Sequence, residues 1–102
     1  MYNVKLIEEA KEDLFFLPDD VLTEVVGYLH NYKTDPYKYS SKLYNQGKLN
    51  LEGYRKTYVA NATYRIVLKI EDDVAKIVEI VAIGSRANKE VYENAHTRIN
   101  KK

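Results

Sequence analysis

Residues 76–99 read KIVEIVAIGSRANKEVYENAHTRI, and they contain the transition that decides the fold. The first half is apolar and β-branched, which is typical of a strand. Gly84 then breaks the pattern, and a helix is expected over about residues 88–99, where apolar residues recur at four-residue steps. Arg86 therefore lies at the end of a strand and Tyr92 in the following helix, so that a cation and a phenol are presented together.

Three strand candidates stand in series, at residues 54–59, 64–70 and 74–83. Short polar connections join them, which predicts an antiparallel meander. In the second, YRIVLKI, every second residue from Tyr64 is aromatic or apolar, so this set faces the core and Arg65 stands on the opposite face. An arginine there is costly unless solvent or an anion satisfies it. In the first candidate both alternating sets are mixed, and the sequence does not say which set shares the face of Arg65.

The chain before the meander predicts a strand and a helical hairpin. Residues 2–7 alternate as a strand does, and residues 8–17 carry apolar side chains at three- and four-residue steps. Pro18 ends this first helix, and the two aspartates after it are good N-cap residues for a second helix that reaches about residue 32. The acidic clusters of the hairpin are interpreted as a solvated helix face.

A long loop connects the hairpin to the meander. Residues 31–47 lack sustained periodicity, and a turn of helix is expected around residues 41–44. Loops of this length in a compact domain are usually functional. Together the patterns predict an α+β fold in a single domain over residues 1–102. It consists of a small twisted antiparallel sheet, an N-terminal helical hairpin packed on one face, and a short C-terminal helix at the edge.

The composition is that of an ordinary globular protein, with 45% hydrophobic and 30% charged residues. The absence of cysteine excludes disulfides and thiolate chemistry. No apolar run approaches the roughly 18 residues of a membrane span, and the N-terminus is too acidic for a signal peptide. A cytoplasmic location without a membrane partner is expected.

The formal net charge of +1 conceals a segregation of charge along the chain. Residues 1–32 contain two Lys and seven acidic residues, a net charge of −5, whereas residues 33–70 contain eight Lys or Arg and two acidic residues, a net charge of +6. Eight of the ten tyrosines lie between Tyr28 and Tyr64. Because a basic segment interleaved with aromatics can hold phosphates by charge and bases by stacking, RNA is a candidate ligand.

Motifs for cofactors are absent from the sequence. It contains no phosphate-binding glycine-rich motif and no zinc-binding histidine motif. The two histidines, His30 and His96, fall in different predicted helices and are interpreted as solvated or capping residues. No metal site and no small-molecule cofactor are expected.

The strongest candidate site combines Lys56, Arg65, Arg86 and Tyr92. RNA is cleaved when its own 2′-hydroxyl attacks the adjacent phosphate, which requires a base, cations for the phosphorane charge and an acid for the leaving oxygen. Arginine supplies a permanent forked charge, and lysine or tyrosine can exchange a proton. Each residue also has a structural interpretation: an ion pair with a carboxylate such as Glu79 for Arg65, capping or pairing near the last helix for Arg86, a core position for Tyr92, and simple solvation for Lys56.

The Tyr64-Arg65 strand start and the closing pair of Arg86 and Tyr92 resemble the signature of RelE-type toxins, in the RelE/ParE superfamily of toxin-antitoxin systems. The predicted order of elements is also similar to that family. The resemblance implies the toxin of a type II system, acting as a ribosome-dependent, metal-independent mRNA endonuclease that inhibits translation. Its partners would be a cognate antitoxin, the ribosome and mRNA.

The resemblance also implies roles for the site residues. Arg65 and Arg86 would bind and stabilise the scissile phosphate. Lys56 would transfer a proton or stabilise charge, and Tyr92 would orient or deprotonate the 2′-hydroxyl. The surrounding residues expected to contact RNA are Lys48, Arg55, Tyr58 and Lys69.

One departure from the family concerns the strand before the Tyr-Arg step. Members often present more than one lysine there, whereas here Tyr54, Lys56 and Tyr58 alternate. The general acid is therefore open, with Tyr58 and Arg55 as candidates. Two other functions are also open: inhibition of DNA gyrase, as in the similar ParE-type toxins, and a non-catalytic RNA- or ribosome-binding module. In either toxin, an acidic, partly helical antitoxin segment is expected to cover the basic face.

Overall fold

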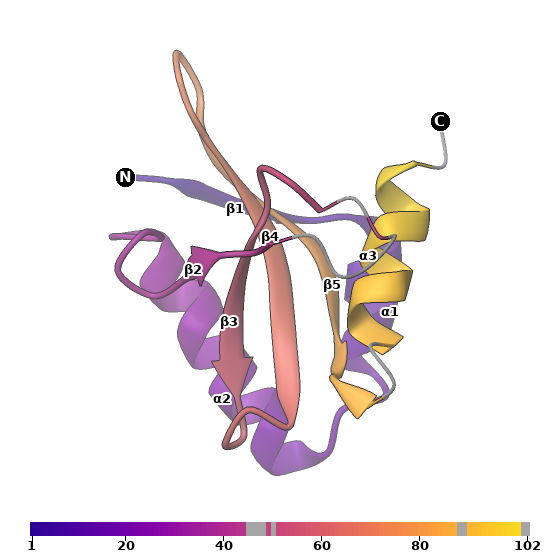
Figure 1. Ribbon diagram of the computed structural model, residues 1–102. Helices are drawn as coiled ribbons and strands as arrows, with labels where there is room; N and C mark the ends of the chain where they lie inside the picture. Colours follow the sequence, from indigo (N-terminus) through magenta and orange to yellow (C-terminus); the bar gives the residue numbers. More distant parts are fainter. Residues whose placement is uncertain (45–48, 50, 88–89, 101–102) are drawn as a thin grey trace.

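The computed structural model describes residues 1–44, 49, 51–87 and 90–100, and in this part of the chain five strands form one sheet (Figure 1). The elements in chain order are β1 (Asn3–Leu6), α1 (Glu8–Leu14), α2 (Asp19–Tyr32), β2 (Ser41–Lys42), β3 (Arg55–Val59), β4 (Tyr64–Asp72), β5 (Lys76–Ser85) and α3 (Glu90–Ile99). The strand order is β1-β5-β4-β3-β2. β3, β4 and β5 form the predicted antiparallel meander, and β1 joins β5 in parallel. The predicted α+β fold is confirmed, and its sheet is antiparallel except for β1.

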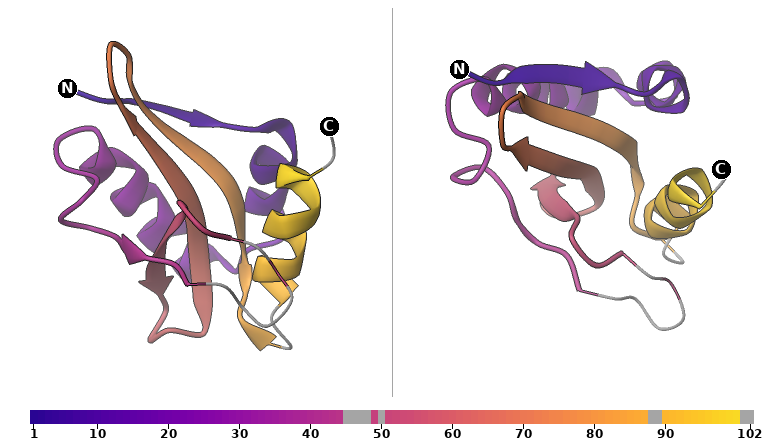
Figure 2. Two further views of the ribbon diagram at one scale, coloured as in Figure 1. Left: turned by 45° about the horizontal axis from the view of Figure 1, so that its top comes forward. Right: turned by 90° about the horizontal axis from the view of Figure 1, so that it is seen from above.

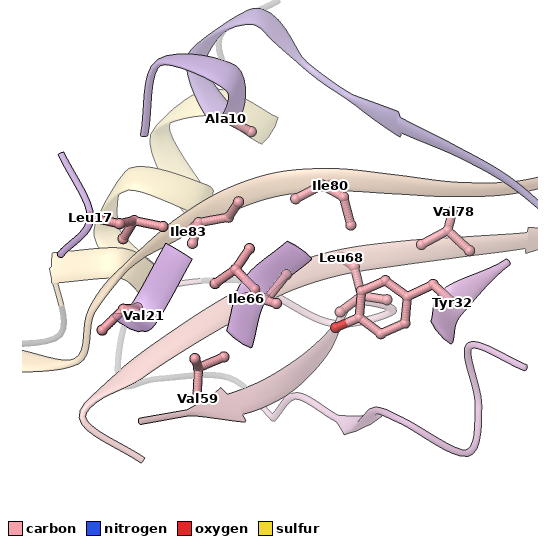
Figure 3. Packing of buried hydrophobic residues seen from close by; sticks show 11 residues of the cluster. Ala10, Leu17, Val21, Tyr32, Val59, Ile66, Leu68, Val78, Ile80 and Ile83 are labelled. Carbon is pink, nitrogen blue, oxygen red and sulfur yellow. The ribbon is translucent and has the colours of Figure 1, made fainter. Parts of the chain in front are cut away.

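The helical hairpin of α1 and α2 covers one face of the sheet. The larger core lies between this hairpin and the sheet (Figure 3). The buried residues of this core are Ala10, Leu17, Val21, Val25, Tyr32, Val59, Ile66, Leu68, Val78, Ile80 and Ile83. The hydroxyl of Tyr32 is satisfied by a short hydrogen bond with Thr57 of β3. This face of the sheet is therefore closed and apolar, as the alternation in β4 predicted.

The first helix is shorter than predicted, because α1 ends at Leu14. The amides of Phe15 and Phe16 donate to carbonyls three residues back, which tightens the last turn. Pro18 disfavours helical geometry in the residue before it, and the turn brings Leu17 into the core while both phenylalanines are 85% exposed. None of the helices in the described residues is long and apolar enough to cross a lipid bilayer.

α3 lies on the opposite face of the sheet, over β5 (Figure 2). A second, smaller core forms there from Leu43, Leu51, Val67, Val81, Ala82, Val91, Tyr92 and Ala95. A β-bulge supports this core: the register between β4 and β5 skips Val81, so that Val81 and Ala82 both face α3. Beyond Ile80 the strand β5 has no β1 partner, so α3 lies at the sheet edge as predicted. The structure adds that α3 packs on the face opposite the helical hairpin.

The predicted turn of helix around residues 41–44 was wrong. Ser41 and Lys42 form the short strand β2, which pairs antiparallel with Lys56 and Arg55 of β3. The open edge of β3 offers backbone hydrogen bonds that a local helical turn would leave unused, and local composition does not reveal such an edge.

Candidate active site

The structure shows which residues of β3 share the face of Arg65. Thr57 points toward the helical hairpin, because its hydroxyl bonds to Tyr32 of α2. The alternating set of Tyr54, Lys56 and Tyr58 therefore lies on the opposite face. Tyr58 stands directly across from Arg65 in the β3-β4 register. The ambiguity that the sequence left in this strand is thus resolved.

The guanidinium of Arg65 is held between two tyrosine rings. Its Cζ lies 4.4 Å from the ring centroid of Tyr58 and 5.6 Å from that of Tyr92. Such contacts stabilise the cation by roughly 0.5–1 kcal/mol each at partly exposed sites. The Nε atom is buried, and no described residue accepts a hydrogen bond from it.

The alternative interpretation of Arg65, an ion pair with a carboxylate such as Glu79, does not hold in the described residues. Glu79 stands opposite Lys69 in the β4-β5 register, and Arg65 stands opposite Gly84, which has no side chain. Among the described residues, the ion pairs are Lys11 with Glu8, Lys76 with Asp72 and Arg98 with Asp13. Arg65 is therefore a half-buried cation without a carboxylate partner in the described part of the chain.

Tyr92 belongs to both the core and the site. It is only 5% exposed and packs in the smaller core, so its interpretation as a core aromatic is correct. Burial raises the pKa of the Tyr92 phenol, and Tyr58 raises it further, while the charges of Arg65 and Arg86 act in the opposite direction. The net shift is upward, so the phenol is neutral at physiological pH.

Arg86 follows β5, at the position that the sequence predicted. Its amide donates to the carbonyl of Thr63 at 3.1 Å, which fixes the backbone beside the β3-β4 turn. The side chain is exposed and lines a shallow cavity of about 420 Å³ together with Thr63, Ser85 and Ala87. No described residue forms an ion pair with it, and its charge acts on Tyr92. Arg86 is therefore a second cation near Arg65.

Two lysines lie on the same face of the sheet as Arg65. The Nζ of Lys56 lies 5.4 Å from the ring centroid of Tyr58 and donates a hydrogen bond to the carbonyl of Lys42 at 3.3 Å. The Nζ of Lys69 lies 5.7 Å from the ring centroid of Tyr54. Cations and phenols thus alternate across this part of the sheet, and we refer to Lys56, Tyr58, Arg65, Arg86 and Tyr92 as the cation-tyrosine face.

Arg55 does not join this face. Its Nε donates to the hydroxyl of Ser40 at 2.7 Å, its Nη2 donates to the Ser40 carbonyl at 2.9 Å, and it stacks 5.2 Å from the Tyr37 ring. It stands opposite Leu68, whose side chain belongs to the hairpin-side core. The expected RNA contact at Lys48 lies outside the described residues.

The two histidines do not share a cleft. His30 is exposed on α2, and His96 lies on α3, which covers the other face of the sheet. The main-chain carbonyl of His96 accepts a hydrogen bond from the Asn100 side chain at 2.8 Å, at the helix C-terminus. In the described residues no three His, Asp or Glu side chains are grouped so that they could hold a metal ion.

An ion pair that the sequence did not reveal anchors α3. The two terminal nitrogens of Arg98, Nη1 and Nη2, donate to the Asp13 carboxylate at 2.7 and 3.0 Å. Nη1 also donates to the Val81 carbonyl. The same carboxylate accepts the amide of Ile83 at 2.9 Å. The interpretation of Asp13 as part of a solvated acidic face was wrong. Its carboxylate accepts the Ile83 amide at the edge of β5, as the carbonyl of a neighbouring strand would, and it also binds Arg98. The sequence shows Asp13 only as one of several acidic residues in the first helix, and this gives no indication of a contact with β5.

The turn between β3 and β4 is strained. Ala60, Asn61 and Ala62 all have positive φ values, of 52°, 55° and 68°, and none of them is glycine. The amide of Ala60 donates to the Glu24 carboxylate of α2, which helps to hold the turn. This turn fixes the register that places Tyr58 across from Arg65.

The order of elements and the sheet topology define the fold of RelE-type toxins, and the resemblance predicted from the sequence is confirmed. The chain is 27% identical to a chain of the toxin-antitoxin complex RelBE2 from Mycobacterium tuberculosis, with a TM-score of 0.66 over 83% of this chain and 98% of that one.

Two further solved structures share the fold. A double arginine-to-alanine mutant of the E. coli toxin RelE in the free state is 22% identical, with a TM-score of 0.72, and the match covers 96% of this chain and 97% of that one. A chain of the archaeal RelE-RelB complex from Pyrococcus horikoshii is 19% identical, with a TM-score of 0.61 over 83% and 94% of the two chains. No family model and no curated protein matches the sequence.

Proposed function

We propose that this protein is the toxin of a type II toxin-antitoxin pair, and that it inhibits translation by cleaving mRNA on the ribosome in the cytoplasm. The observation that carries the proposal is Arg65, a half-buried guanidinium with an unsatisfied Nε and no carboxylate partner among the described residues. A cation held in this way is stabilised by an anion that arrives from outside, and an RNA phosphate is such an anion. The shared fold with RelE toxins supports the same function.

The two arginines act on the scissile phosphate. Arg65 binds it through the nitrogens at the end of its fork, and Arg86, which is exposed, closes on it from the end of β5. Their charges stabilise the phosphorane as the ribose 2′-hydroxyl attacks, a contribution that typically amounts to about 10²–10³ in rate for each donor. Because the substrate supplies its own nucleophile, the reaction needs no metal-activated water.

Tyr92 orients the 2′-hydroxyl. The raised pKa keeps the Tyr92 phenol protonated at neutral pH, so the oxygen can donate or accept a hydrogen bond but is a weak base. Of the two roles that the resemblance implies for this residue, orientation is thus better supported than deprotonation. Lys56, whose amine is tied to the Lys42 carbonyl beside Tyr58, adds positive charge next to the phosphate.

The proposed partner is an antitoxin with an acidic, partly helical segment that covers the cation-tyrosine face. Two of the matched structures are complexes of a toxin with an antitoxin. Binding of such a segment over Arg65 and Tyr92 would exclude RNA and compete with the packing of α3. A complex whose interface is confined to the acidic outer side of α1 and α2 would contradict this arrangement.

The test is to map mRNA 5′ ends on translating ribosomes, after brief induction in cells and with purified components. Wild-type protein is expected to produce new ends within codons, and Arg65→Ala to abolish them. Lys11→Ala is the matched control, since it removes an exposed cation on the helical hairpin and should leave cleavage unchanged.

Other outcomes would identify another function. Intact transcripts together with DNA damage would indicate gyrase inhibition, as in ParE-type toxins. Ribosome binding by the wild type without any new mRNA ends would indicate a non-catalytic module.

A further inference from the structure

Two phenols flank the guanidinium of Arg65, and they differ in accessibility. Tyr92 is 5% exposed and Tyr58 is 49% exposed. Both rings lie within 6 Å of the same cation, at 5.6 Å for Tyr92 and 4.4 Å for Tyr58. A phosphate on Arg65 therefore has one buried and one solvent-exposed phenol as neighbours.

The sheet order places these phenols on opposite sides of Arg65. β4 lies between β3, which carries Tyr58, and β5, over which α3 and Tyr92 pack. An in-line displacement at phosphorus needs catalytic groups on opposite sides of the phosphate, because the attacking and leaving oxygens are both apical. If Tyr92 orients the attacking 2′-oxygen, Tyr58 is on the side of the leaving 5′-oxygen.

Few groups near Arg65 are able to deliver a proton to that oxygen. Arginine does not release protons near neutral pH, and Arg55, the other candidate that the sequence left open, is held by Ser40 on the far face. Among the described residues, neither the ring contacts of Arg65 nor its partners on the neighbouring strands include a histidine or a carboxylate. Lys56 and Tyr58 are the remaining candidates on this side, and the amine of Lys56 already donates to the Lys42 carbonyl.

We propose that Tyr58 is the general acid of the cleavage reaction and protonates the leaving 5′-oxygen. This inference rests on the proposed function and assigns one further catalytic role within the same site. The 2′-oxygen forms a bond to phosphorus and passes its proton to water, the bond from phosphorus to the 5′-oxygen breaks, and the Tyr58 phenol transfers its proton to that oxygen. The products are a 2′,3′-cyclic phosphate, a 5′-hydroxyl and the Tyr58 phenolate, which regains a proton from water.

The surroundings of Tyr58 suit both halves of this cycle. Lys56 and Arg65 lie 5.4 and 4.4 Å from its ring centroid, so two positive charges adjoin the ring as the proton leaves. The 49% exposure of the side chain gives solvent direct access for reprotonation. In this chain the strand before the Tyr-Arg step thus carries a phenol with two neighbouring cations.

The test uses ribosomes programmed with an mRNA in which sulfur replaces the 5′-bridging oxygen at the mapped cleavage site. Sulfur leaves readily as a thiolate and needs no acid, so loss of the acid no longer slows the reaction. On normal mRNA, Tyr58→Phe is expected to lower the single-turnover rate about 10²–10⁴-fold, the usual contribution of a positioned acid. On the sulfur-containing mRNA, the same variant should cleave at nearly the wild-type rate, while Arg65→Ala stays slow.

Tyr37→Phe is the matched control, because Tyr37 is 44% exposed and its ring also lies beside an arginine, Arg55, away from the site. It should cleave both substrates like the wild type. An equal deficit of Tyr58→Phe on both substrates, or no deficit on either, overturns the assignment. Sulfur rescue of Lys56→Ala in place of Tyr58→Phe gives the acid role to Lys56. A wild type that cleaves neither substrate refutes the proposed function itself.

Discussion

The two faces of β4 carry opposite kinds of side chain. On the hairpin side, Ile66 and Leu68 are fully buried under α1 and α2. On the other side, Arg65 and Lys69 are half-buried cations, and α3 covers only the part of the sheet around Val67. Neighbouring residues along one strand thus have different roles. The buried apolar side chains stabilise the fold, whereas the half-buried cations on the other face lower its stability. Uncompensated charge of this kind is typical of a functional surface.

The comparison is tested most strongly by Arg65→Ala. Loss of this guanidinium is expected to reduce mRNA cleavage on ribosomes by at least about 10²–10³-fold. Its unsatisfied Nε offsets the two ring contacts, so the free energy of unfolding should stay within about 1 kcal/mol of the wild type. Single-turnover cleavage and urea denaturation measure the two quantities. A large loss of stability would mean that Arg65 mainly supports the fold.

The adjacent substitution, Ile66→Ala, should show the reverse pattern. It empties a fully buried position opposite Ile83 and is expected to lower the free energy of unfolding by about 2–5 kcal/mol. The protein that remains folded should cleave with a nearly normal rate constant, because the side chain does not reach the cation-tyrosine face. Urea denaturation gives the stability, and activity per folded molecule gives the rate. If cleavage per folded molecule falls as far as in Arg65→Ala, the two faces are not independent.

A smaller effect is expected at the link between the faces, the pair of Arg98 and Asp13. Their side chains are 15% and 17% exposed, and Arg98→Ala leaves the Asp13 carboxylate with the Ile83 amide as its remaining partner. We expect a loss of about 1–3 kcal/mol in unfolding free energy. Hydrogen exchange should rise in α3 before it rises in α2, and cleavage should fall because Tyr92 is less well fixed.

The exposed pair of Lys11 and Glu8 is the matched control for that experiment. Its side chains are 57% and 83% exposed, and such surface pairs contribute little to stability. Lys11→Ala should therefore change neither the unfolding free energy nor the exchange of α3. Uniform protection across α2 and α3 in Arg98→Ala would show that the ion pair does not anchor α3 specifically.

The parts of this fold that the sequence predicts are those encoded by local periodicity. The alternation in residues 64–70 placed Arg65 on the face opposite the core, and the Gly84 break placed Arg86 and Tyr92 correctly relative to β5. Both signals are local, because the direction of a side chain in a strand depends only on its neighbours in the chain. The resemblance in these motifs also predicted the fold.

The parts that the sequence does not predict depend on contacts between distant segments. Residues 54–59 have two equally mixed sets, and contacts with distant residues distinguish them: Thr57 shares a hydrogen bond with Tyr32, and Val59 packs in the hairpin-side core. The role of Asp13 depends on Arg98, 85 residues away. β2 exists because β3 has a free edge, which no property of residues 41–44 reveals. The choice between Arg55 and Tyr58 as candidate general acid also belongs to this group, since only the structure shows that Tyr58, and not Arg55, shares the face of Arg65.

The smallest effect concerns two buried tyrosines and appears only at alkaline pH. Burial raises the pKa of the Tyr32 phenol, under the hairpin, far above the ordinary value of 10. The hydrogen bond with Thr57 acts in the opposite direction, and Tyr28 adds a smaller rise. The folded pKa lies above the unfolded one, so this contribution to stability is complete below about pH 10 and is lost as the pH rises toward the folded pKa.

We therefore expect the free energy of unfolding to be flat from pH 8 to 9 and to fall above pH 10, and Tyr32→Phe to make that fall shallower. Tyr92→Phe should do the same to a lesser extent, because Arg65 and Arg86 oppose the rise in the pKa of Tyr92 on the open face. Urea denaturation at each pH, with tyrosinate absorbance as the second probe, measures both. An equal effect of the two substitutions would show that the cations of the open face do not act on Tyr92, and the electrostatic difference between the faces would then be smaller than the geometry indicates.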